Sequence, residues 1–163
     1  KIYATYGGQG IAADAHHIAQ PEPEGRGVIL AMNRALADGD LSTKDIFHVN
    51  AHATSTPAGD VAEAKAIRKV LGSDSDHAPV TAVKGVAGHL LGGAGSLAAL
   101  ASILAIKNRI VPPVGNLVNL ADGVEIDVVM STPRELPTGD IAALSNSFGF
   151  GGHDIVLAFR NYS

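Results

Sequence analysis

Extended and helical patterns alternate along this 163-residue chain, and that alternation is typical of a layered fold in which helices pack on a sheet. Helical spacing of apolar residues predicts a helix over 28–36 that ends at Gly39, and a second that begins at Pro57 with Thr56 as its N-cap. The predicted strands are 2–11, 46–51, 80–83, 125–130, 141–145 and 154–159. We therefore expect one α/β domain over residues 1–163, with a bend in the first strand at Gly7, Gly8 and Gly10.

One segment is apolar enough to raise the question of a membrane. Leu90 to Ile106 carries no charge, and its only polar side chains are Ser96 and Ser102. It is shorter than the roughly 20 apolar residues that a bilayer requires, and glycines interrupt it. We therefore predict a helix over 88–107 that is buried in a layered core, with no membrane contact.

Composition excludes several functional classes. The chain has no cysteine, so it forms no disulfide scaffold, offers no cysteine ligand for zinc and carries no thiol nucleophile. Its net charge is −4 and it has no run of Lys and Arg, so we expect no nucleic-acid partner. The first residues read as a strand and not as a signal peptide, which favours a soluble cytoplasmic protein.

The first polar cluster lies between a predicted strand and a helix, at 50–57, and is followed by Asp60 and Glu63. His52 in this position can donate a hydrogen bond to a carbonyl, and the hydroxyls beside it can bind an amide-bearing ligand. A capped helix beside a surface histidine explains the same residues. His48 and His52 are four residues apart but lie on a predicted strand, so we expect no metal site.

Two more clusters follow along the chain. Lys84 and His89 flank the start of the apolar segment, where burial of either group is costly without a partner. The glycines around them lack the spacing of a phosphate-binding loop. The third cluster, 146–153, places Phe148 and Phe150 among glycines. It fits either a hairpin with glycines at positive φ or a mobile loop that gates a pocket and turns its amides toward an oxyanion.

Together the three clusters resemble the C-terminal half of the β-ketoacyl-acyl carrier protein synthases, the elongating condensing enzymes. The first is similar to the family's N-A-H-G-T-S-T-P-x-x-D-x-x-E, the second to K-S-x-x-G-H-x-x-G-A-A-G, and the third to N-S-F-G-F-G-G. The likeness extends over essentially the whole chain. It implies a thiolase-like layered fold, of which this chain is one α/β half.

The resemblance also implies a decarboxylative Claisen condensation between an acyl-enzyme and malonyl-acyl carrier protein. His52 and His89 take the place of the family's two catalytic histidines, with Lys84 as the third catalytic residue. Lys84 and Glu63 are expected to orient His89, while Asp60, Phe148 and Phe150 support the site. Thr54 and Thr56 are expected to bind the phosphopantetheine arm, and the Phe150 amide to form part of the oxyanion hole.

The same resemblance implies partners but no bound cofactor or metal, because the phosphopantetheine arrives on the carrier protein. The expected partners are acyl carrier protein, the N-terminal half of the same enzyme and a second copy in a homodimer. Because the acylated cysteine belongs to the N-terminal half, this chain alone is expected to be inactive. It is also expected to expose an apolar patch where that half packs.

Three residues depart from the family pattern: Ala53 and Gly85 replace a glycine and a serine, and Asp154 replaces an asparagine. The loss of a hydroxyl at Gly85 is expected to loosen the placement of Lys84. Two alternatives stay open: a ketosynthase of polyketide or mycolic-acid type, and a non-catalytic partner subunit such as a chain-length factor. Retention of both His52 and His89 argues against the second.

Overall fold

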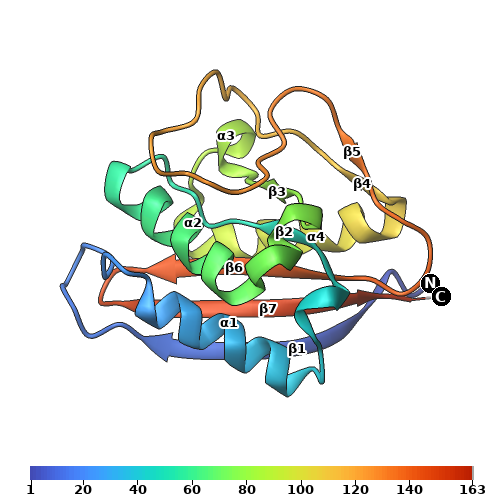
Figure 1. Ribbon diagram of the computed structural model, residues 1–163, viewed down its shortest axis with the longest axis horizontal. Helices are drawn as coiled ribbons and strands as arrows, with labels where there is room; N and C mark the ends of the chain where they lie inside the picture. Colours follow the sequence, from blue (N-terminus) through green and yellow to red (C-terminus); the bar gives the residue numbers. More distant parts are fainter. Residues whose placement is uncertain (163) are drawn as a thin grey trace.

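A five-stranded mixed sheet forms the centre of the computed structural model, which describes residues 1–162 (Figure 1). Its strand order is β1-β7-β6-β2-β3. β2 pairs in parallel with both β3 and β6, whereas β6, β7 and β1 pair antiparallel. The strands are β1 (Ala4–Ala13), β2 (Ile46–Asn50), β3 (Val80–Thr81), β6 (Ala142–Gly149) and β7 (His153–Asn161).

Helices cover both faces of this sheet. α1 (Arg26–Asp38) and α2 (Pro57–Leu71) contact each other on one face, and α4 (Ala94–Asn108) packs against β6, β2 and β7 on the other (Figure 1). The predicted ends of the first two helices are confirmed, because Gly39 caps α1 and Thr56 precedes Pro57 at the start of α2. The arrangement confirms the predicted layered α/β fold.

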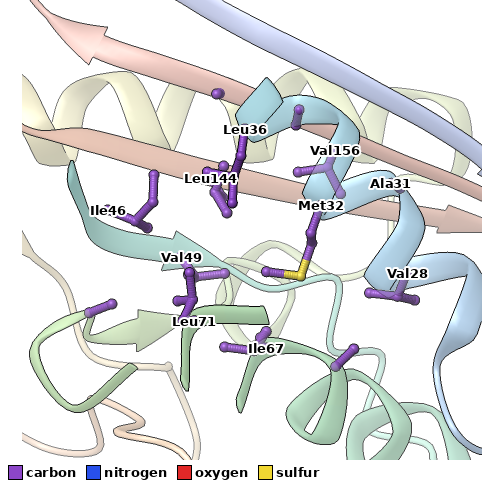
Figure 2. Close-up of a cluster of buried hydrophobic side chains, with 14 of the residues drawn as sticks. Val28, Ala31, Met32, Leu36, Ile46, Val49, Ile67, Leu71, Leu144 and Val156 are labelled. Atoms are coloured by element: carbon purple, nitrogen blue, oxygen red, sulfur yellow. The ribbon is translucent and has the colours of Figure 1, made fainter. Parts of the chain in front are cut away.

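The main core lies between α1, α2 and the sheet. Met32 of α1 points toward Val49 of β2 and Ile67 of α2, and all three side chains are fully buried (Figure 2). Burial of one such side chain contributes about 1.5–3 kcal/mol. The core therefore fixes β2 and β6 relative to α2.

The bend predicted near the start of the chain is confirmed. The pairing of β1 with β7 shifts register between Tyr6 and Gly8. Farther along the strand, a β-carbon on Gly10 would overlap the carbonyl oxygen of Ala31 in α1. Glycine is required at this position because the helix backbone lies directly on the strand.

The helix predicted over 88–107 is wrong at its beginning. Gly88 and Leu91 have positive φ angles of 74° and 51°, and a 3₁₀ turn (Leu91–Gly93) precedes α4. The Leu91 N–H donates to the ring of His89, so it makes no helical bond. The prediction of a buried helix is also wrong within this chain: only 28% of Leu91–Asn108 is buried, and Leu100 and Leu104 are exposed.

Several predicted strands differ from the observed ones at one or both ends. The strand expected over 80–83 is limited to β3, because the short helix α3 (Lys84–Ala87) follows at once. Residues 125–130 form only a single bridge to β3, between Val128 and Val80. β6 continues four residues beyond the predicted end at Ser145. A second small sheet of β4 (Ile110–Val111) and β5 (Arg134–Glu135) was not predicted.

Candidate active site

The three polar clusters meet because each follows or ends one of three neighbouring parallel strands. His52 lies two residues after β2, Phe148 lies near the end of β6, and Lys84 begins α3 just after β3. The carboxyl ends of parallel strands share one edge of a sheet, and this edge is where open α/β folds bind ligands. The fold therefore brings together the motifs that the sequence places far apart.

Two histidines form the centre of this cluster. The ring of His52 lies edge-on to that of His89, with centroids 5.7 Å apart and an interplanar angle of 84°. The ring of Phe148 contacts His52 from another side, at a centroid distance of 5.2 Å. His52 is half-buried, whereas His89 is exposed in this chain.

Main-chain donors set the tautomer of both rings. Nδ1 of His52 accepts the N–H of Phe148 at 3.2 Å, and Nδ1 of His89 accepts the N–H of Leu91 at 3.1 Å. A nitrogen that accepts a hydrogen bond carries no proton, so in each neutral ring the proton is assigned to Nε2. Each histidine therefore presents one N–H donor to a ligand.

The environment of His52 keeps this ring neutral. Burial lowers the pKa of His52 to about 3, and electrostatic interactions with Lys84 and His89 act in the same direction. His52 is consequently a hydrogen-bond donor through Nε2, and not a cation, over the whole physiological pH range. A neutral imidazole that donates to an oxygen can stabilise negative charge that develops there.

The hydrogen bonds of Lys84 go to His52 and not to His89. Its ammonium donates to the His52 carbonyl oxygen and lies 3.4 Å from Nδ1 of the same residue. Burial lowers the pKa of Lys84, while the charges of Glu63 and Asp60 oppose that shift. The expectation that Lys84 and Glu63 orient His89 is therefore not met by the contacts, which converge on His52.

Glu63 fixes the backbone around His52 through hydrogen bonds. Its two carboxylate oxygens accept the N–H groups of His52 and Ala53, each at 2.9 Å, and the side-chain amide of Asn146 at 2.9 Å. Glu63 and Asn146 are buried, and burial raises the pKa of Glu63. Ala53 has a φ of 28°, a conformation that few non-glycine residues adopt. The carboxylate thus anchors a strained turn that carries the histidine.

The residues expected to bind the phosphopantetheine arm lie at the start of α2. The hydroxyl oxygens of Thr54 and Thr56 are 3.2 Å apart, so one donates to the other. Neither hydroxyl caps the helix. Asp60 accepts the N–H of Ser55 at 3.1 Å, and burial raises the pKa of this carboxyl. The two threonines keep free hydrogen-bonding capacity for a polar ligand.

The phenylalanine-glycine cluster is a hairpin between β6 and β7. Gly151 and Gly152 have φ angles of 83° and 77°, which matches the hairpin interpretation. Phe148 lies in β6, not in the connecting loop, and packs against the main core. Phe150 lies at the tip of the hairpin and is 79% exposed. The structure therefore places Phe148, but not the Phe150 ring, against His52.

Within residues 1–162, no group of three or more His, Asp and Glu side chains is placed to hold an ion. His48 is fully buried, and its Nδ1 lies 3.0 Å from the carbonyl oxygen of Pro79. The His48 ring therefore has a structural role, beside the residue that precedes β3.

Comparison with known proteins agrees with the geometry of the site. Residues 3–118 match the family model of the β-ketoacyl synthase C-terminal domain. The chain belongs to this family. It is 44% identical over 162 residues to the 3-oxoacyl-[acyl-carrier-protein] synthase 2 of Synechocystis sp. and 43% identical over 161 residues to that of Vibrio harveyi. The two matches include 99% and 98% of this chain, but the chain spans only 38% of the length of each relative.

Solved structures match the β-ketoacyl synthase domain over its full length. One is AntDE:AntF, a type II polyketide acyl-carrier protein in complex with its ketosynthase, with a TM-score of 0.94 and 27% identity. Another is a β-ketoacyl synthase from Burkholderia phymatum, with a TM-score of 0.90 and 33% identity. The chain covers 40% and 38% of these two chains. The thiolase-like fold implied by the sequence motifs is therefore confirmed.

Two contributors to the site were not identified from the sequence. Asn146 belongs to the third motif and was assigned no role, although a fully buried amide requires a polar partner. The Leu91 main chain supplies the donor that sets the His89 tautomer. An apolar sequence gives no indication that Leu91 has a positive φ, so this contact could not be predicted from the sequence.

Asp154, the residue that replaces a family asparagine, predicts a pH-dependent stability. Burial, followed by the charges of Asp14 and Glu63, raises its pKa from 3.8 to about 7. Between these two values the folded protein binds a proton that the unfolded chain releases, so stability falls as the pH rises from about 4 to about 7. We expect Asp154→Asn to raise the melting temperature strongly at pH 8 and clearly less at pH 5, where only part of this loss has occurred.

Thermal melts of the wild type and Asp154→Asn at both pH values test this expectation. Asp122→Asn is the matched control, because that carboxyl is exposed. Equal shifts at pH 5 and pH 8 would contradict the assigned ionisation of Asp154.

Proposed function

We propose that the chain is the C-terminal half of a 3-oxoacyl-acyl carrier protein synthase and supplies the groups that decarboxylate malonyl-acyl carrier protein. This proposal rests on one observation: Nδ1 of His52 and Nδ1 of His89 each accept a hydrogen bond from a main-chain N–H. Two Nε2–H groups can then donate to one thioester oxygen. No metal or redox cofactor enters this scheme.

Decarboxylation begins when the bond between the malonyl carboxylate and the α-carbon breaks. Its electron pair moves into an enolate whose negative charge is greatest on the thioester oxygen, and CO₂ leaves. His52 and His89 donate to that oxygen without transferring a proton. Their donors stabilise the enolate more than the neutral thioester, which is the requirement for catalysis.

Condensation follows when the enolate carbon attacks the acyl thioester of a cysteine in the N-terminal half. The tetrahedral intermediate collapses, the carbon–sulfur bond breaks and the cysteine leaves as a thiolate. We assign the main-chain N–H of Phe150 to the oxyanion hole and its exposed ring to the acyl entrance. Thr54 and Thr56 bind the amides of the phosphopantetheine arm in this scheme.

The relatives support the fatty acid version of this reaction over its alternatives. Identity is 43–44% to the curated 3-oxoacyl-acyl carrier protein synthases, but 27% to the polyketide ketosynthase of AntDE:AntF. A polyketide ketosynthase is the second candidate, because that structure gives a TM-score of 0.94. The intact histidine pair argues against a non-catalytic, chain-length-factor-like role.

An assay of the full-length parent tests the proposed reaction. With acyl- and malonyl-acyl carrier protein as substrates, mass spectrometry should detect a 3-oxoacyl product two carbons longer than the primer. Formation of neither this product nor CO₂ would overturn the proposal. Repeated extension of one primer without intervening reduction would favour the polyketide alternative.

The exposed face of α4 is the surface that we assign to the N-terminal half. Leu100 and Leu104 are 52% and 40% exposed there. Ile11 and Ile155 pair across β1 and β7 and are also exposed. Exposed apolar surface of this kind marks an interaction site. The family resemblance also leads us to propose a homodimer of the intact protein and a cytoplasmic location.

Expression of residues 1–163 alone provides a test of this surface. We expect the isolated chain to bind a hydrophobic dye and to self-associate, and Leu100→Glu with Leu104→Glu to reduce both. Co-expression with the N-terminal half should likewise suppress dye binding. A monodisperse isolated chain that binds no dye would contradict the assignment.

A further inference from the structure

We propose that residues 112–118, through Gly115 and Asn116, clamp α3 at Gly85 and thereby position Lys84 against His52. This inference deepens the proposed function, because it adds positioning residues to the same site. Gly85 is one of the departures from the family motif, and its missing hydroxyl was expected to loosen Lys84. The structure instead fills the space beside Gly85 with another backbone segment.

The contact is a close approach of two glycines. A β-carbon on Gly85 would overlap the Gly115 carbonyl oxygen, and a β-carbon on Gly115 would overlap the Val86 side chain. Neither glycine has a positive φ, so space and not backbone conformation excludes a side chain. The two positions are therefore coupled.

A hydrogen bond closes the clamp. The Asn116 side-chain amide donates to the Gly85 carbonyl oxygen at 2.7 Å. Asn116 has a φ of 61°, a left-handed conformation that asparagine tolerates better than most residues. The amide thus bonds to the residue that directly follows Lys84.

Backbone hydrogen bonds connect the clamp to the sheet. The Val114 N–H donates to Val129 at 2.8 Å, and the Val129 N–H donates to Val80 of β3 at 2.9 Å. α3 is therefore held from both sides: its chain leaves β3, and residues 112–118, tied to β3 through Val129, press on Gly85. A helix of four residues has little stability of its own, so this support determines where Lys84 lies.

The test uses variants of the full-length parent that add or remove single contacts. Gly85→Ser must displace backbone, whereas the overlap in Gly115→Ala is with one methyl group of Val86; the next nearest atoms to that β-carbon lie 3.4 and 3.5 Å away. Val86→Ala should therefore restore Gly115→Ala but not Gly85→Ser. Val118→Ala, 79% exposed in the same segment, is the matched control.

The readouts are the melting temperature, malonyl decarboxylation and the NMR titration of His52. The titratable groups around His52 and Lys84 are His89, Glu63 and Asp60. We expect Gly85→Ser to slow decarboxylation on the order of 10²-fold, the loss typical of a displacement of about 1 Å. The pKa of His52 should rise, because its unfavourable interaction with Lys84 weakens.

Several outcomes overturn the clamp. They are a wild-type melting temperature for Gly115→Ala, failure of Val86→Ala to restore it, and an unchanged His52 titration in Gly85→Ser. If Gly85→Ser does not fold, Asn116→Gly, which removes the amide bond and tolerates the positive φ, gives the same titration test. The melts and the titration need no turnover, so an inactive parent refutes the proposed function while leaving the clamp to be judged separately.

Discussion

Replacement of either histidine in the intact parent should nearly abolish malonyl decarboxylation. His52→Ala and His89→Ala each remove one of two N–H donors to the enolate oxygen, and loss of one such donor typically costs about 10²–10³ in rate. Release of CO₂ from malonyl-acyl carrier protein measures this step without the condensation that follows. Transfer of the acyl group to the enzyme should be affected much less, because it uses main-chain donors.

The control for these variants is His16→Ala, since His16 is exposed and lies in the loop between β1 and α1. His16→Ala should release CO₂ at the wild-type rate. Near-normal decarboxylation by either His52→Ala or His89→Ala would contradict the assigned roles. Loss of activity in all three variants would point to a general structural defect.

The pH profile separates a neutral donor from a general acid. Because burial lowers the pKa of His52 to about 3, this ring should not change charge between pH 5 and pH 8. The pH–rate profile of decarboxylation should therefore show no rise or fall caused by His52 between pH 5 and pH 8. An NMR titration that placed its pKa near 6.5 would contradict this account.

Removal of the Glu63 carboxylate should produce the second large effect. In Glu63→Ala, the N–H groups of His52 and Ala53 and the amide of Asn146 all lose their acceptor. Each buried donor left without a partner costs about 1–3 kcal/mol. Since natural domains have a total stability of only about 5–15 kcal/mol, the parent should unfold at a much lower denaturant concentration.

Glu135→Ala is the matched control, because Glu135 is exposed on β5. Glu63→Gln should be intermediate, since its amide keeps one acceptor oxygen but places a donor against neighbouring N–H groups. Decarboxylation by Glu63→Gln should also fall, as the turn that carries His52 relaxes. An unfolding midpoint for Glu63→Ala equal to that of Glu135→Ala would contradict the anchoring role of Glu63.

Local signals in the sequence predicted the elements whose boundaries depend on local chemistry. Pro57 and Gly39 correctly predicted where α2 begins and α1 ends, because a proline and a glycine act through their own backbone preferences. The segment 88–107 failed, because the break at Leu91 depends on a hydrogen bond to His89. The hydropathy of the segment does not indicate that hydrogen bond.

The sequence predicted which residues form the site better than it predicted the contacts between them. His52, Lys84 and Phe148 do meet, because their motifs follow neighbouring parallel strands. Which histidine Lys84 and Glu63 contact depends on the path of α3 and of the turn at Ala53, and only the three-dimensional structure determines these paths. The contact between Gly85 and Gly115 likewise joins segments thirty residues apart that share no sequence pattern.

Mapping the acyl adduct in the full-length parent tests most directly whether this chain supplies decarboxylation while another part supplies the nucleophile. After incubation with acyl-acyl carrier protein alone, peptide mass spectrometry should find the acyl group on a cysteine outside residues 1–163. In His52→Ala and His89→Ala the same adduct should form and then persist when malonyl-acyl carrier protein is added. An adduct within residues 1–163, or its normal consumption by both variants, would contradict the account.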